Sequence, residues 1–349
     1  MKIFFYSILT IITVAVAAYL LGPKPDKPMY SKELPEVPEN LSELERYLRK
    51  KEGGLPVKPG NEAQIIWAND SARTQTEYAV IYLHGFSSSH EEGNPAHKYF
   101  AKKYGCNLLL TRLSDHGLKV DEPMLHFTAD RLWNSALEAY AIGRRLGKKV
   151  ILMSTSTGGT LSLKLAAEFP EIHSLIMFSP NIEIYNNSTA ILNDPWGLQL
   201  ARYTAGGESV NIQRSDEHKK YWYDSYRLEA VVQLQELVET TMTPETYNKV
   251  KQPVLLLYYY KDAQHQDNVV SVEAMQDMFK LLRTPGSQKR KMAIPEAGNH
   301  VIASHLRSKD VRSVKTATEQ FAEEVLKMKP VEEKNGSFSE VFVLESQEQ

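Results

Sequence analysis

Short apolar runs alternate with helical segments along most of this 349-residue chain, and this alternation constrains the fold more than any other feature. Most of the runs are apolar at consecutive positions, which is typical of strands buried on both faces of a parallel sheet. We expect the intervening helices to cover those two faces. The predicted strands are 63–68, 78–83, 106–110, 150–153, 174–178, 253–260 and 289–294. The sequence therefore predicts an α/β fold with a mostly parallel central sheet flanked by helices.

The alternation breaks between residues 181 and 252. This stretch is polar, with helical patches and many aromatic residues, and it is too long for a simple connection. We interpret it as an inserted helical lid over the strand ends; a surface excursion without a ligand role is the alternative. The α/β core is then predicted to comprise residues 61–180 and 253–329. A charged tail covers 330–349, in which 341–344 is a candidate edge strand.

The amino terminus carries an almost wholly apolar run over residues 3–22. A run of about 20 apolar residues is long enough to span a bilayer. Residues 15–17 have the Ala-x-Ala form of a signal-peptide exit, but the apolar run continues beyond them. We therefore predict that residues 1–22 form a membrane anchor with the body outside the cytoplasm, periplasmic or extracellular; secretion after signal cleavage is the alternative. Residues 23–60 are predicted to be a proline-rich linker and a short amphipathic helix.

Composition excludes several classes of partner and cofactor. The formal net charge is −2, and no basic segment indicates binding to nucleic acid. The single cysteine, Cys106, opens an apolar run and is expected to be a buried thiol, so no intramolecular disulfide can form. No cluster of cysteines and histidines has the spacing of zinc ligands. We therefore predict no metal and no cofactor.

The strand 150–153 leads into a helix at Gly158 through a short polar turn. A strand that reverses sharply into a helix with a serine at its tip is a nucleophile elbow, and Ser156 would occupy that tip. Small residues are needed two positions to either side because the two backbones nearly touch there. Gly158 is one of them, whereas Ser154 replaces the glycine usual on the other side. The alternative is an ordinary turn whose serines cap the helix.

Three chemically suitable residue types each follow a predicted strand, in the order Ser, Asp, His along the chain. Ser156 follows the fourth predicted strand, Asp262 and Asp267 follow the sixth, and His300 follows the seventh. Sites in open parallel sheets lie at the carboxyl ends of the strands, so these side chains are expected to converge. A serine needs a histidine base to attack, and a carboxylate orients that histidine. The order predicts a catalytic triad, with either aspartate as its acid.

These residues and two further loops resemble the α/β-hydrolase superfamily, and within it the lidded esterases and monoacylglycerol-lipase-like enzymes. Residues 84–86, His-Gly-Phe, are similar to the His-Gly motif after the third strand of that family. Residues 112–117 are similar to its Gly-His-Gly loop, with Asp115 in place of the first glycine. The elbow and the loop ending at His300 complete the resemblance, which covers about residues 65–327.

The resemblance implies a serine hydrolase that cleaves carboxylic esters through an acyl-enzyme, with Ser156 as nucleophile and His300 as base. It favours Asp267 over Asp262 as the acid, because residues 267–270 are similar to the family's Asp-x-Val-Val. Asp262 would then be a solvated loop carboxylate. The carboxylate fixes the tautomer of the histidine and stabilises its protonated form.

By the same resemblance, the backbone amides of Phe86 and Thr157 form the oxyanion hole. The expected substrate is a small apolar ester, with monoacylglycerol as one candidate, because the predicted lid is aromatic and an anchor would hold the site near lipids. The sequence does not identify the residues that bind the substrate. Two alternatives remain: an amide or carbon–carbon bond hydrolase with the same triad, and a membrane-tethered binding protein without activity. The departures at Ser154 and Asp115 are the reason for considering the second.

Overall fold

A single sheet of seven strands organises the part of the chain, residues 2–331, that the computed structural model describes. Its strands are β1 (Gln64–Ile66), β2 (Thr76–Leu83), β3 (Asn107–Leu110), β4 (Gly147–Thr155), β5 (Ser174–Phe178), β8 (Val254–Tyr258) and β9 (Lys289–Ala293). Their order is β1-β3-β2-β4-β5-β8-β9, and β1 is antiparallel to β3 while every other neighbouring pair is parallel. The predicted mostly parallel sheet is confirmed.

Both faces of the sheet are apolar, which explains the continuous apolar runs in the sequence. Successive side chains of a strand point to opposite faces. In β2, Ile81 and Leu83 therefore join the core on one face, and Val80 and Tyr82 join the core on the other. The edge strand β9 differs, because most of its residues are exposed.

Helices cover the two faces, as expected. The larger core is covered by α2 (Leu41–Gly53), α4 (Ala129–Leu146), α5 (Thr157–Glu168) and α10 (Val272–Leu281), and the smaller core by α3 (Ala96–Lys103) and α11 (Val311–Gln320). A π-helical turn, Phe321–Val325, follows α11. The candidate edge strand at 341–344 lies outside the described residues.

The segment between β5 and β8, residues 181–252, forms a mainly helical insert, and this name is used for it below. It contains η2 (Asn187–Ile191), α6 (Gly197–Ala205), α7 (Asp216–Tyr221), α8 (Leu228–Thr241) and α9 (Pro244–Tyr247), together with the paired strands β6 (Ser209–Asn211) and β7 (Ser225–Arg227). The helix α8 packs against α4 and α5, which ties the insert to the body. The segment is mainly helical, as the sequence predicts, whereas its small two-stranded antiparallel sheet was not predicted.

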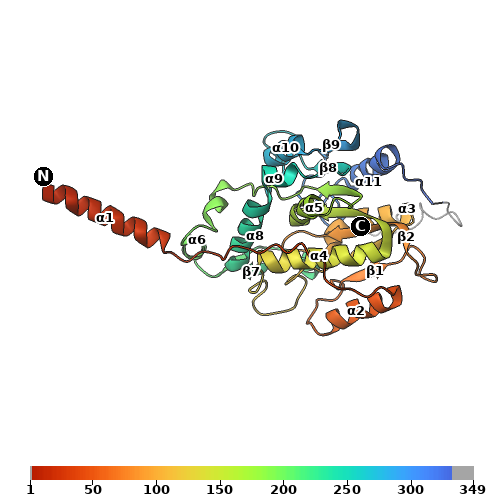
Figure 1. The fold of residues 1–349 in the computed structure, drawn as a ribbon, viewed down its shortest axis with the longest axis horizontal. Coiled ribbons are helices and arrows are strands. Elements are labelled where there is room, and N and C mark those ends of the chain that lie inside the picture. Colours follow the sequence, from red (N-terminus) through yellow and green to blue (C-terminus); the bar gives the residue numbers. More distant parts are fainter. Residues whose placement is uncertain (1, 332–349) are drawn as a thin grey trace.

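The amino-terminal helix α1 (Lys2–Leu20) projects away from the body, with its carboxyl end beside α6 (Figure 1). Residues 3–20 are exposed, and α1 is the one helix among the described residues that is long and apolar enough to cross a membrane. The composition of the span therefore agrees with an anchor or with a signal sequence.

The proline-rich linker lies along α4 and is bonded to the body. The indole N–H of Trp133 donates to the carbonyl oxygen of Ser31 over 2.7 Å. Lys32 forms an ion pair with Glu168 at 2.8 Å, although the lysine is largely exposed. Such bonds hold a segment whose composition alone indicates only a stiff spacer.

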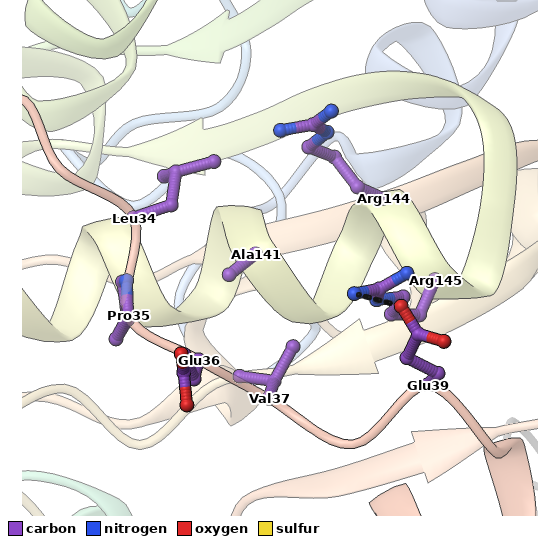
Figure 2. A pocket seen from close by; sticks show the side chains of 8 residues that line it. All are labelled: Leu34, Pro35, Glu36, Val37, Glu39, Ala141, Arg144 and Arg145. Atoms are coloured by element: carbon purple, nitrogen blue, oxygen red, sulfur yellow. Dashed lines mark ion pairs between the residues drawn. The ribbon is translucent and has the colours of Figure 1, made fainter.

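A cavity of about 530 Å³ separates part of the linker, residues 34–39, from α4 (Figure 2). Its wall includes Arg144 and Arg145, and Arg145 forms an ion pair with Glu39 at 3.2 Å. The wall contains no serine, cysteine or histidine, so this cavity lacks the groups that nucleophilic catalysis needs.

Candidate active site

Ser156 occupies the sharp turn between β4 and α5, with φ 54° and ψ −120°. A positive φ is strained for a serine, and such strain persists only where neighbouring bonds impose it. The amide of Ser156 donates to the oxygen of Phe178 over 3.1 Å, and its carbonyl accepts from Asn181 over 2.9 Å. A Cβ at Gly158 would lie 1.9 Å from the carbonyl oxygen of Leu83, so only glycine fits there. The predicted sharp turn is therefore present, with Ser156 at its tip.

The two departures from the family pattern have structural explanations. Ser154 is the last but one residue of β4 and pairs with Leu83 and Met177 in strand conformation, where a Cβ is accommodated. Asp115 has φ 63°, the conformation for which glycine is usual, and its carboxylate binds Arg131 at 3.0 and 2.9 Å. Neither residue lines the pocket that contains Ser156.

His300 is bonded to Asp267 within the core of the protein. Its Nδ1 lies 2.6 Å from Oδ2 of Asp267, whose side chain is fully buried. The other carboxylate oxygen accepts from the amides of Val269 and Val270 over 2.9 and 3.1 Å. These bonds fix the carboxylate, which in turn orients the imidazole ring and leaves its Nε2 available.

Asp262, the alternative acid, has a different partner. Its Oδ1 lies 2.9 Å from Nδ1 of His265, and both side chains are more than half exposed. The structure therefore pairs His300 with Asp267 and leaves Asp262 on the surface.

Other histidines near the strand ends support loops. The Nε2 of His84 accepts from the amide of Leu113 over 3.1 Å, and Nδ1 of His116 lies 2.8 Å from the carbonyl oxygen of Ser114. Burial lowers the pKa of His84 and lowers that of His116 to about 4, so both rings are neutral near pH 7. His305 is exposed and bonds the carbonyl of residue 94. His300 is thus the ring that shares a pocket with Ser156.

Two backbone amides next to Ser156 are available as donors. Thr157 is the first residue of α5, where helix geometry leaves the N–H without a partner inside the helix. Phe86 lies in the loop after β2, and neither amide donates to any residue in the range 2–331. A Cβ at Gly85 would lie 2.9 Å from Cβ of Ser156, so this loop approaches the serine closely. The arrangement can hold a developing oxyanion.

A pocket of about 530 Å³ opens at this edge of the sheet and contains Ser156, Thr157, His300 and Phe86. The hydroxyl of Ser156 makes no hydrogen bond to the described residues, and an apo site often tightens only when substrate binds. Across residues 2–331, no group of three or more side chains is placed to hold a metal. The apolar part of the wall, much of it from the insert, comprises Phe86, Ile184, Ile212, Trp222, Tyr226, Val231, Leu234, Val269, Val270 and Val301.

Three charged residues of the pocket, Glu92, Arg214 and Arg307, were not predicted from the sequence. Glu92 lies seven positions after Gly85. This short separation from the His-Gly motif is the one sequence signal that could have indicated Glu92 as a pocket residue. Arg214 belongs to the insert, and no motif marks its position or that of Arg307.

The carboxyl group of Glu92 is buried in the wall of the pocket that contains Ser156. Its Oε2 accepts from the amide of Gly85 over 2.5 Å, which helps hold the loop that carries Phe86. Burial raises the pKa of Glu92 to about 7 despite this bond and the nearby charge of His300. Burial also lowers the pKa of His300, but the charge and hydrogen bond of Asp267, with the charge of Glu92, outweigh burial and raise it. Activity that needs neutral His300 therefore falls as the pH drops through this raised pKa.

We expect Glu92→Gln to stabilise the folded protein above pH 7 by up to about 3 kcal/mol. The folded pKa of about 7 exceeds the usual 4.5, so the fold favours the protonated acid. The wild type therefore loses stability as the pH rises from about 4.5 to about 7, whereas glutamine stays neutral and still accepts from Gly85. Urea unfolding at pH 4.5 and pH 8 measures this. A stability difference that does not grow with pH would contradict it.

Comparison with known proteins gives matches among solved structures only. No protein-family model and no curated protein matches this sequence. A metagenome-derived lipolytic enzyme aligns at TM-score 0.60 and 18% identity, over 76% of this chain and 98% of that one. The monoacylglycerol lipase of Paleococcus ferrophilus aligns at TM-score 0.54 and 16% identity, over 74% and 98%. Est1E from Butyrivibrio proteoclasticus, solved with ferulic acid bound, aligns at TM-score 0.52 and 17% identity, over 78% and 98%.

Proposed function

Because this chain has the α/β-hydrolase fold, we propose that it is a serine hydrolase that cleaves carboxylic esters. One observation carries the proposal: the strained Ser156 shares a pocket with His300, whose far ring nitrogen is bonded to the buried Asp267. A base that is oriented by a buried carboxylate is what a serine nucleophile requires.

In the proposed mechanism, Oγ of Ser156 attacks the ester carbonyl while Nε2 of His300 takes its proton. The amides of Phe86 and Thr157 donate to the oxyanion of the tetrahedral intermediate, and Asp267 stabilises the imidazolium. His300 then gives the proton to the departing alcohol, which leaves an acyl-enzyme. A water molecule, deprotonated by His300, attacks the acyl carbonyl; the bond from the acyl carbon to Oγ of Ser156 breaks, His300 returns the proton to Oγ, and the acid is released.

We propose esters of moderate size with an apolar acyl group as the substrates. The pocket volume of about 530 Å³ lies in the range of small-molecule sites, and about half of its lining residues are apolar. Monoacylglycerols are a specific candidate, because the structurally similar Paleococcus ferrophilus protein is a monoacylglycerol lipase.

Labelling with a fluorophosphonate probe tests the proposed function. We expect one probe per folded chain, attached to Ser156 and located by peptide mass spectrometry, because only an activated serine reacts. Protein denatured before labelling should not react, which shows that the fold activates the serine. A folded protein that stays unlabelled and does not cleave p-nitrophenyl butyrate would contradict the proposal.

We also propose that residues 1–22 are retained as a membrane anchor and that the body lies outside the cytoplasm. The end of α1 contacts the insert: Nε1 of Trp196 donates to the carbonyl oxygen of Ala18 over 3.0 Å. The backbone amide of Trp196 donates to the carbonyl oxygen of Pro23 over 2.9 Å. Contacts on both sides of Gly22 support a helix that stays with the mature protein.

Fractionation of cells that express the full chain checks the anchor. We expect the protein to stay in the membrane fraction after an alkaline carbonate wash, and its intact mass to include residues 1–22. A chain that starts at residue 23 should be recovered in the soluble fraction. A mature protein that begins after residue 17 would show signal cleavage instead.

A further inference from the structure

Two arginines of the catalytic pocket have no acidic partner. Arg214 comes from the insert and Arg307 from the loop after His300, and both are half-buried. Neither forms an ion pair with any residue between 2 and 331. Arginines that are more deeply buried do: Arg112 lies 2.7 Å from Glu52, and Arg227 binds three glutamates. Because buried charges are normally paired, the two pocket arginines call for an anion from outside the chain.

Arg214 is held in place with its outer nitrogens free. Its Nε donates to the carbonyl oxygen of Tyr223 over 3.0 Å, and no described residue accepts from its two Nη groups. Burial lowers the pKa of Arg214, and the charge of Arg307 lowers it further. Two cations that repel each other in a half-buried pocket bind an anion placed between them more strongly than a single surface cation would.

The nearest carboxylates do not neutralise this pair. Glu92 acts on Arg214 through its charge, but its carboxyl is committed to the amide of Gly85 at 2.5 Å and is only partly ionised near pH 7. Asp224 also acts on Arg214, but its Oδ2 lies 3.3 Å from Nζ of Lys219, with which it forms an ion pair.

The positive pair lies close to the reacting groups. The charge of Arg307 acts on His300 and lowers its pKa, against the larger effect of Asp267. Because the arginines and Ser156 line one pocket, a single molecule can place an anionic group at the arginines and its ester at Ser156, with the apolar residues of the wall around the chain between them.

We propose that Arg214 and Arg307 form an anion subsite of the catalytic pocket. The substrate is then an ester whose acyl or alcohol part ends in a carboxylate or a phosphate. Guanidinium groups bind both through paired N–H donors, which gives orientation as well as attraction. This inference deepens the proposed ester hydrolysis and rests on it.

The test compares two matched pairs of esters. The carboxylate pair is the p-nitrophenyl monoester of adipic acid against p-nitrophenyl hexanoate, which has the same acyl chain length. The phosphate pair is 1-hexanoylglycerol 3-phosphate against 1-hexanoylglycerol. We expect kcat/KM to be at least about ten-fold higher for the anionic member of one pair, and that pair identifies the anion.

The double variant Arg214→Gln/Arg307→Gln is expected to reduce this preference to about two-fold or less. The ratio within a pair is the readout, because general damage to the fold lowers both members alike. Arg46→Gln serves as the matched control, since Arg46 is exposed on α2 and does not line the pocket. Two results would overturn the subsite: equal kcat/KM for the anionic and neutral members of both pairs, or a preference for the anionic member that the double variant retains.

Binding without turnover separates this inference from the proposed activity. Adipate and glycerol 3-phosphate, each at millimolar concentration, are added to the full chain carrying Ser156→Ala, and Tm is measured. We expect one of them to raise Tm, and the rise to disappear when both arginines are replaced by glutamine. No rise with either anion overturns the subsite. If the Ser156→Ala chain shows this rise in Tm but the wild-type protein cleaves none of the four esters, the anion subsite is supported and the proposed hydrolase activity is refuted.

Discussion

Ser156→Ala is expected to lower kcat for p-nitrophenyl esters by about 10⁶-fold, to the level of residual catalysis by the rest of the site. The variant lacks the hydroxyl that we propose attacks the carbonyl, so we expect no acyl-enzyme to form. Alanine also keeps the small volume that the turn requires, and the backbone bonds of Ser156 to Phe178 and Asn181 do not involve its side chain. Steady-state kinetics and fluorophosphonate labelling should both report the loss, with Tm little changed.

Ser154→Ala is the matched control for this change. Ser154 lies two residues away, is fully buried, and its hydroxyl has no hydrogen-bond partner among the described residues. We expect activity close to that of the wild type. Hydrolysis that persists in Ser156→Ala, or equal losses in the two variants, would show that Ser156 is not the nucleophile.

Asp267→Asn is expected to lower kcat by about 10⁴-fold, as loss of the triad carboxylate does elsewhere. An amide at this position cannot stabilise the imidazolium, and it favours the tautomer of His300 that points a proton at Ser156. Its oxygen can still accept from the amides of Val269 and Val270, so the loop is expected to keep its shape. Kinetics at several pH values measure the loss of catalysis, and Tm shows whether the replacement also disturbs the fold.

Asp262→Asn is the internal comparison, since both aspartates follow the same strand. Asp262 is exposed and paired with His265, so we expect less than about a three-fold change in kcat. A large loss in Asp262→Asn with little loss in Asp267→Asn would reverse the assignment of the acid.

The main features of the sheet could be predicted because they depend on local sequence. Continuous apolar runs indicate strands buried on both faces, and the small residues around Ser156 indicate a sharp turn. The structure has both. The antiparallel pairing of β1 with β3 was not predicted, because the polarity of a short strand does not reveal the direction of its neighbour.

The site was predictable to the extent that strand ends converge. Chain order placed Ser156 and His300 at one edge of the sheet but could not choose between Asp262 and Asp267. The choice depends on burial: Asp267 is fully buried against His300, and this property arises from packing between distant segments. Arg214 could not be predicted for the same reason, since a polar insert gives no period or motif that directs one arginine inward.

The family pattern was least informative where this chain departs from it. Two replaced glycines suggested a scaffold that had lost its activity. Ser154 fits because its position has strand geometry, and Asp115 fits because aspartate tolerates a positive φ and its carboxylate binds Arg131 of α4. A replaced glycine is therefore informative only when the backbone angle and the space around its Cβ are known.

The contacts between the linker and the body limit the positions that the body can take relative to α1. If the linker were a free flexible chain, its ends would lie roughly 20 Å apart on average, and the body could take any orientation relative to α1. Bonds from Ser31 and Lys32 to the body shorten the free part of the linker and restrict how far the body can move relative to α1. With α1 retained in a bilayer, as we propose, the pocket would stay within a narrow range of heights above the membrane, and substrate would be met by diffusion along the membrane surface.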